Sequence, residues 1–201
     1  MKNILFIVIT SLLFSCSQDE NNTLMNDLIS KELSKNENVD EFFLDFKFGM
    51  DKTAYNNSIK SHLTSKDLFV FLDSYSYKFS QDNINWFLYP DFHNDSLIGI
   101  TLRVIDNLSS DNLRETLNLF SIHESVLTQY IKLYGQPSMS VNRYDNYWFI
   151  KNMKIQIEKT DNDIRVIYEN IRRMRKIDYS KYRIDEDLNS FDSAYFEQRN
   201  H

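Results

Sequence analysis

One cysteine, Cys16, carries the most reactive side chain in this 201-residue sequence. A cysteine thiolate is a nucleophile and a metal ligand, and it can also be alkylated by lipid. With a single cysteine the chain forms no intramolecular disulfide, so the folded part depends on its packed core. The composition allows such a core, since 42% of the residues are hydrophobic and 14% are aromatic.

The residues before Cys16 follow the pattern of an export signal. Lys2 supplies a positive charge, and a mostly apolar run follows over residues 4–14. This run is shorter than the roughly 20 apolar residues that a membrane-spanning helix needs, whereas it suits a cleaved secretory signal. We therefore expect residues 1–15 to be a signal peptide, and we exclude them from the folded part.

Leu13-Phe14-Ser15-Cys16 resembles the lipobox of bacterial lipoproteins, with leucine three positions before the cysteine and a small residue just before it. The resemblance implies that lipid is attached to the sulfur of Cys16, that the chain is cut before Cys16, and that the new terminus is acylated, for example with palmitate. It also implies a membrane as partner through that lipid. Phe14 departs from the small residue usual at its position, and an ordinary signal peptide with an incidental cysteine is the alternative.

Residues 17–22, Ser-Gln-Asp-Glu-Asn-Asn, are polar and acidic and lack apolar periodicity. One interpretation is a solvated tether between the lipid and the folded part. The other is a signal for surface export, because an acidic stretch after the lipidated cysteine resembles that of Bacteroidota lipoproteins. We expect a protein anchored by lipid in the outer membrane, and both its periplasmic side and the cell surface stay open as locations.

The formal net charge of −6 argues against nucleic acid as a partner, since phosphate binding needs a basic face. A basic run does occur at Arg172, Arg173, Arg175 and Lys176. We interpret this run as a patch that faces solvent or lipid headgroups near the end of the fold.

No spacing in the sequence builds a familiar metal site. His62, His93 and His123 lie far apart, and none belongs to a His-Glu-x-x-His motif. In residues 91–95, Asp-Phe-His-Asn-Asp, alternate side chains of an extended loop could hold a divalent cation, although a polar turn is the ordinary interpretation. Residues 161–163, Asp-Asn-Asp, resemble the start of a calcium loop but lack its glycine and distal glutamate, so we expect a turn there.

Only three glycines occur in the sequence, which excludes a phosphate-binding loop, a dinucleotide-binding fingerprint and a Gly-x-Ser-x-Gly elbow. We expect no cofactor and assign no catalytic residue. A nucleophile assembled from distant residues stays open as an alternative.

Aromatic side chains on expected strands are the remaining lead to a function. We assign Trp86, Tyr89, Tyr147 and Trp148 as candidate binding residues, because Tyr and Trp are enriched in binding surfaces. Alternation over residues 144–150 places aromatic rings on both faces of that strand. A partner could cover one of these faces, and the alternative is a core strand that is buried on both faces.

The first part of the chain alternates between helical and strand patterns. An amphipathic helix is expected over residues 24–33, a strand over residues 42–48, and a helix that begins at Lys52 with Asp51 as its N-cap. The further expected elements are strands over residues 68–72, 75–79, 84–89 and 97–105, with a hairpin connection over residues 90–96.

The later part predicts a helix followed by an antiparallel meander. Apolar periodicity favours a helix over residues 113–134, and Gly135 and Pro137 give a strong stop signal. Strands are then expected over residues 144–150, 153–159 and 164–170, joined by tight turns.

These elements predict an α+β fold with helices packed on antiparallel β-meanders, and two similar helix-then-sheet halves fit the pattern. The expected divisions are the signal peptide at residues 1–15, the lipidated cysteine with tether and short helix at 16–38, two halves at 39–106 and 107–176, and a polar C-terminal extension at 177–201. That extension either docks through its aromatic residues or stays mobile.

Gly49-Met50-Asp51 and Tyr134-Gly135-Gln136-Pro137 resemble the start and the end of the helical region in small SmpA/BamE-like lipoproteins of the outer membrane. The resemblance covers about a third of the chain, rests on commonplace residues, and implies only a similar arrangement of helix and sheet.

The leading hypothesis is a membrane-anchored envelope lipoprotein without enzymatic activity, which binds another envelope protein or assists assembly through a sheet face or edge. The alternative is a binder of a small or glycan ligand in a cleft between the two halves, and an enzyme with a dispersed site comes third. A wide aromatic surface favours the protein partner, a pocket lined by Trp86 or Trp148 favours the ligand, and clustered acids with histidine favour the enzyme.

Overall fold

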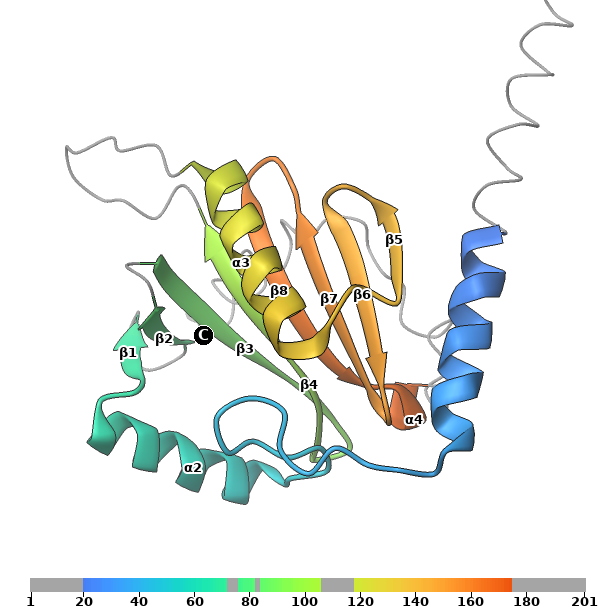
Figure 1. Cartoon of the computed structure of the whole chain (residues 1–201). Coiled ribbons are helices and arrows are strands. Elements are labelled where there is room, and N and C mark those ends of the chain that lie inside the picture. Colours follow the sequence, from blue (N-terminus) through green and yellow to red (C-terminus); the bar gives the residue numbers. More distant parts are fainter. Residues whose placement is uncertain (1–19, 72–75, 82–83, 106–117, 175–201) are drawn as a thin grey trace, which may run out of the picture.

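The computed structural model describes residues 20–71, 76–81, 84–105 and 118–174 (Figure 1). Its helices are a first helix over residues 20–34, α2 (Lys52–Ser65), α3 (Leu119–Tyr134) and α4 (Ile171–Met174). Its strands are β1 (Phe69–Phe71), β2 (Ser76–Gln81), β3 (Ile84–His93), β4 (Ser96–Ile105), β5 (Met139–Asn142), β6 (Asp145–Ile150), β7 (Met153–Lys159) and β8 (Asp163–Asn170). Helices with an antiparallel sheet confirm the expected mixed class, and the sheet is its dominant part.

The eight strands form one sheet in the order β1-β2-β3-β4-β8-β7-β6-β5, and every neighbouring pair is antiparallel. Its middle is the pairing of β4 with β8, which runs from Gly99 opposite Glu169 to Ile105 opposite Asp163. A Cβ atom at Gly99 would lie 2.6 Å from the carbonyl oxygen of Tyr168, so this close approach of the two backbones requires glycine. The sheet is therefore continuous, and no space separates β4 from β8.

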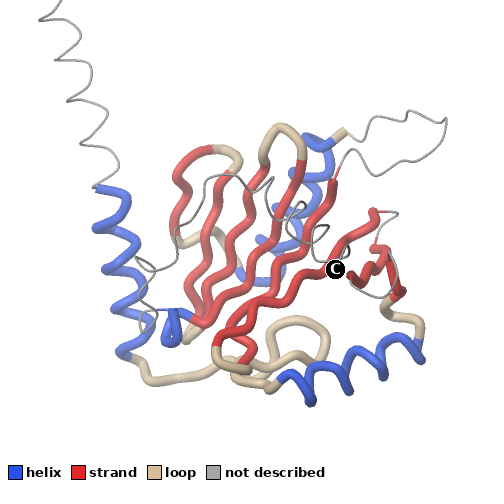
Figure 2. Tube along the Cα trace, turned by 180° about the vertical axis from the view of Figure 1, so that it is seen from behind, coloured by secondary structure: helices blue, strands red, loops and turns tan. Residues whose placement is uncertain are grey.

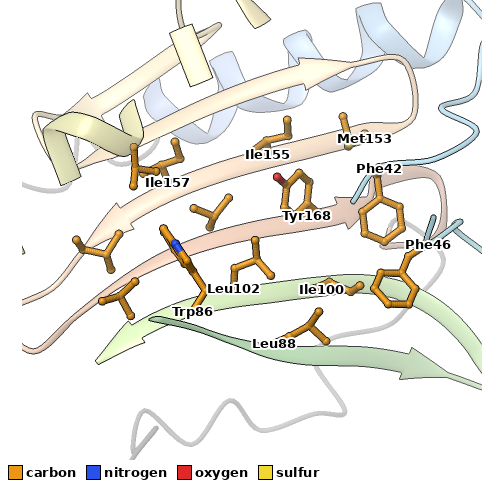
Figure 3. Packing of buried hydrophobic residues seen from close by; sticks show 14 of the residues in the cluster. Phe42, Phe46, Trp86, Leu88, Ile100, Leu102, Met153, Ile155, Ile157 and Tyr168 are labelled. Carbon is orange, nitrogen blue, oxygen red and sulfur yellow. The ribbon is translucent and has the colours of Figure 1, made fainter. Parts of the chain in front are cut away.

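The hydrophobic core lies between one face of the sheet and α3, α2 and the loop over residues 39–48 (Figure 1). Alternate residues of β3, β4, β7 and β8 point into it, as the two-residue period of a strand requires. Figure 3 shows this layer, in which Trp86, Leu102, Ile155, Ile157 and Tyr168 meet one another from four strands, and Phe42 and Phe46 close it from the loop.

The expected helix signals are confirmed where the structure describes them. The Asp51 carboxylate accepts a hydrogen bond from the backbone N–H of Ala54 at 2.7 Å, which caps α2. Gly135 ends α3 with φ of +80°, a value that favours glycine, and its N–H donates to the carbonyl of Ile131 at 2.9 Å. The Trp148 indole then donates to the Gly135 carbonyl at 2.9 Å, which ties the helix end to the core.

The expected strand over residues 42–48 is wrong. This segment is a loop whose only strand-like feature is an isolated bridge between Phe43 and Phe46. Leu44 has a φ of +51°, which turns the chain so that Phe42 and Phe46 are buried in the core while Leu44 is exposed. A strand would have placed all three side chains on one face. The aromatic residues of this segment are therefore dense because they pack into the core, and not because the segment is a strand of the sheet.

The hairpin between β3 and β4 is shorter than expected. β3 continues through Pro90 to His93, and only Asn94 and Asp95 turn the chain, both with positive φ. Proline is tolerated at this point because the pairing of β3 with β2 ends at Leu88, so the missing N–H breaks no ladder on that side.

Four other expectations change or fall outside the described residues, and one strand was not expected. Residues 20–22 belong to the first helix and not to an irregular tether, and β5 is a strand that was not expected. The linker at 106–111, the start of the expected second helix at 113–117 and the extension at 177–201 lie outside the described residues.

Candidate binding surface

The sheet face opposite α3 is seen from behind in Figure 2. Alternate residues of β4, β7 and β8 place polar and charged side chains on it, and we call it the polar face. The first helix lies along its β5–β6 margin and packs there on Tyr147 and Phe149. By strand alternation and register, the side chains of its centre are Phe87, which is buried, Tyr89, Thr101, Arg103, Lys154, Gln156, Glu158, Asp163, Arg165, Ile167 and Glu169.

Asp163 is the centre of an ion-pair network on this face. Its side chain is only 1% exposed and accepts hydrogen bonds from Arg103, from Arg165 at 2.9 Å and from Thr160. Burial alone would raise the pKa of Asp163, but the bonds from Thr160 and Arg165 and the charge of Arg103 outweigh it and hold the pKa below its usual value. Arg165 also pairs with Glu158 at 3.0 Å, so one guanidinium joins β7 to β8.

A second polar cluster continues the network toward β6. The Gln156 side-chain nitrogen lies 3.1 Å from each of three acceptors on Asp145, Tyr147 and Glu158, and the Tyr147 hydroxyl donates to Asp145 at 2.9 Å. Burial raises the pKa of Glu158; Arg165 opposes this shift and the nearby Asp145 adds to it. These contacts hold polar side chains of three strands in fixed positions.

Lys154 and Glu169 form a further ion pair across β7 and β8, with both side chains mostly buried. Charges of opposite sign thus alternate across the polar face and compensate one another. A partner that binds here meets side chains that are already ordered, which lowers the entropy lost on binding.

The four candidate binding residues from the sequence separate between the two faces. Trp86 and Trp148 are buried in the core on the α3 side. Tyr147 is buried on the polar face beneath the first helix, and Tyr89, on the same face, is 39% exposed. Because Trp86, Trp148 and Tyr147 are buried, Tyr89 is the candidate that a partner can reach.

Asp45, His62 and Asp67 form a titratable cluster that the sequence analysis did not find. The imidazole of His62 lies between the two carboxylates, 2.7 Å from Asp45 and 3.2 Å from Asp67. Burial lowers the pKa of His62, but its bonds to the two acids outweigh this and raise the pKa above its usual value. Ser58 is buried and already donates to Asp45, so the cluster ties the loop of residues 39–48 to α2.

The other histidines are not brought together with acids in a metal-binding arrangement. Within the described ranges, no group of three or more His, Cys, Asp or Glu residues could hold a metal ion. His93 ends β3 with Asn94 beside it at 3.1 Å, and Asp161 and Asn162 form the expected turn before β8. His123 is fully buried on α3, and neither of its ring nitrogens has a hydrogen-bond partner among the described residues.

The described surface includes two shallow hollows that bear on the ligand hypothesis. One is lined by residues 142–145 and 158–160, and the other by Phe43, Leu44, Phe69, Phe79 and their neighbours. Neither is lined by Trp86 or Trp148, and neither lies between β4 and β8, where a ligand cleft between halves would be.

Arg172 and Arg173 of the expected basic patch make specific bonds within the fold. Arg172 donates to the side chain of Asn36 at 3.0 Å and to the carbonyl of Glu37 at 3.3 Å, and Arg173 donates to Ser96 at 2.7 Å. Arg172 therefore holds the segment after the first helix against α4, and Arg173 holds the start of β4 there. Arg175 and Lys176 lie outside the described residues.

The expected lipidation of Cys16 also falls outside the described residues. In the part of the chain that the structure describes, no helix is long and apolar enough to span a membrane. Comparison with known proteins gives no match to a family model, to a characterised protein or to a solved structure.

Proposed function

We propose that this protein is a lipoprotein of the cell envelope, anchored through lipid on Cys16, and that its polar face binds another envelope protein without catalysing a reaction. The observation that carries the partner proposal is the ordered network of ion pairs and hydrogen bonds on β4, β6, β7 and β8. Charged groups held in such a pattern favour one partner over others by electrostatic complementarity. Tyr89, which is partly exposed on the same face, adds an aromatic contact of the kind enriched in interfaces.

The anchor proposal rests on the order of charge, apolar run, small residue and cysteine at residues 2–16. The location that follows is the outer membrane, on either its periplasmic or its outer side. The acidic residues Asp19 and Glu20, three and four residues after the cysteine, support the outer side.

We also infer that the chain contains two similar halves. α2 precedes the meander β1–β4, α3 precedes the meander β5–β8, and the last strand of each meander pairs with the other at the centre of the sheet. This symmetry supports a repeat whose two meanders meet at the centre of the polar face.

The partner proposal is tested with a photo-crosslinking residue, benzoylphenylalanine, at Thr101 in the middle of the polar face. The matched control carries the same residue at Thr128, which is exposed on the far side of α3. We expect irradiation of intact cells to give a discrete protein adduct from position 101 and none from position 128. The partner proposal is refuted if position 101 yields no adduct or if both positions yield the same ones.

The anchor proposal is tested with Cys16→Ala. We expect the precursor to keep its signal peptide or the folded part to leave the membrane, while the intact mass of the parent protein shows a diacylglyceryl cysteine at its N-terminus. An unmodified thiol in the mature parent protein would contradict the anchor and leave the partner test unaffected.

A further inference from the structure

We infer that one end of the sheet lies against the bilayer, and that Arg143 and Lys159 there bind the phosphates of lipid headgroups. We call this the turn end; it comprises Phe120, Val141, Arg143, Tyr144 and Lys159. The inference rests on the proposed lipidation of Cys16 and adds the orientation of the molecule on its membrane.

The lipid and the folded part are joined by a very short segment. The first helix is already formed at residue 20, four residues after Cys16. Four residues span at most about 14 Å even when fully extended. The start of this helix must therefore stay within about 14 Å of the lipidated cysteine.

The first helix is also fixed to the sheet and cannot swing as a free stalk. Met25, Leu28 and Ile29 pack on the side chains of Met139, Tyr147 and Phe149. At its far end, Glu32 accepts a hydrogen bond from the backbone N–H of Lys151 at 3.0 Å. Just beyond the helix, the Asn152 side chain accepts from Val39 at 2.6 Å, which holds the chain on the β6–β7 turn.

These contacts set the direction in which the helix points. Its last turn lies at Lys151, so its start points along β6 toward the β5–β6 turn, as Figure 1 shows. The helix rises about 18 Å from residue 32 to residue 20, while the strand rises about 26 Å from residue 151 to residue 143. The remaining difference of about 8 Å is shorter than the 14 Å that residues 16–20 can span, so the lipid reaches the level of the turn end.

The side chains of the turn end have the chemistry of a membrane interface. Phe120 is 40% exposed and Val141 is 42% exposed, and the Arg143 side chain is 60% exposed. The Arg143 guanidinium lies 4.5 Å from the centroid of the Phe120 ring, and the Lys159 amine lies 5.1 Å from that of Tyr144. Aromatic rings favour the headgroup level, and neighbouring cations can reach lipid phosphates from there.

The charge of this end explains why an anchor is needed as well. Glu124 lies 3.4 Å from Arg143 and offsets part of its charge. Asp145 and Glu158 line the same hollow as the two cations, and Asp161 lies on the neighbouring β7–β8 turn. The cations therefore attract a membrane only weakly, whereas stable membrane binding takes two signals, such as a lipid and a basic contact. The covalent lipid therefore supplies the attachment, and the turn end supplies the orientation.

The orientation is tested with two single-cysteine variants, because the native cysteine is consumed by lipid. Asp161→Cys places a thiol on the exposed β7–β8 turn beside the turn end, and the matched Asp40→Cys places one next to Val39, at the opposite end. Each is labelled with bimane, and the lipidated protein is reconstituted in phosphatidylethanolamine–phosphatidylglycerol vesicles that contain a headgroup-linked nitroxide lipid. We expect most of the fluorescence to be lost at position 161 and little at position 40.

A second variant tests the headgroup contact itself. Arg143→Gln with Lys159→Gln, in the Asp161→Cys background, should weaken the quenching, whereas the control pair Lys47→Gln with Lys60→Gln should leave it unchanged. Equal quenching at positions 161 and 40 in lipidated protein overturns the orientation and leaves the anchor standing. Unchanged quenching in the Arg143 and Lys159 variant overturns the headgroup contact, and a mature protein without diacylglycerol overturns both the anchor and the orientation.

Discussion

Gly99 is the residue that sets the distance between the two central strands. A methyl group at this position would stand 2.6 Å from the carbonyl oxygen of Tyr168, which is a backbone atom held by the β4–β8 pairing. The substitution Gly99→Ala therefore cannot be absorbed by rotation of a side chain. One of the two strands has to move.

The size of the effect follows from this geometry. The two atoms must separate by about 0.8 Å, from 2.6 Å to the 3.4 Å at which ordinary contact begins. Forcing one extra methyl group into a packed site costs about 1–3 kcal/mol. Alanine also lowers the conformational entropy of the unfolded chain relative to glycine, and this offsets about 0.5–1 kcal/mol of the cost. We expect a net loss of about 0.5–2 kcal/mol in the free energy of unfolding, equivalent to a fall in Tm of roughly 2–6 °C.

Thermal unfolding followed by circular dichroism measures this loss. The control is Thr101→Val, two residues along the same strand and on the same face, which keeps the side-chain volume and should change stability by less than about 0.5 kcal/mol. A Tm for Gly99→Ala equal to or above that of the parent would show that β4 and β8 are not packed as closely as described.

Three further substitutions test separate contacts. Asp51→Ala removes the acceptor for the N–H of Ala54 and should lower the free energy of unfolding by about 1 kcal/mol, measured by urea titration; no loss would mean that this cap is unimportant. Burial lowers the pKa of His123, so its neutral form is favoured in the fold, and stability should fall as the pH drops below the unfolded-state value near 6.5. His123→Leu should reduce that fall between pH 7 and pH 5, and an unchanged pH slope would contradict it. Asp163→Ala leaves Arg103 and Arg165 without the carboxylate that they share. Chemical denaturation should show a loss of about 3–5 kcal/mol in the free energy of unfolding, and a loss below about 1 kcal/mol would show that the network is not stabilising.

The helices and most strands could be predicted because their signals are local. A capping aspartate marks the start of α2, and Gly135 marks the end of α3, since only glycine adopts its backbone angles cheaply. β7 and β8 alternate apolar and polar residues, which fixes both their type and their face. β5 could not be found in this way, because four residues with one buried side chain leave no pattern to detect.

The polar face could not be predicted, because its contacts depend on register between distant strands. Arg103 meets Asp163 only because β4 pairs with β8, and nothing near either residue in the sequence records that pairing. The cluster around His62 has the same origin, since Asp45 reaches it through a loop that sequence reasoning had assigned to a strand. The burial of Trp86 and Trp148 in the core could not be predicted either, because large aromatic side chains occur in cores as well as in interfaces.

The pairing of β4 with β8 also governs how the chain can fold as it is made. A chain that leaves a ribosome or a translocon with its N-terminus first releases residues 96–105 well before residues 163–170. During that interval the outer edge of β4 has no strand to satisfy its backbone groups, and an unpaired edge readily joins a strand of another molecule. Closing so long a loop is slow compared with forming the hairpins on either side. Rapid pairing with β8 therefore limits the time in which this edge is open to other strands.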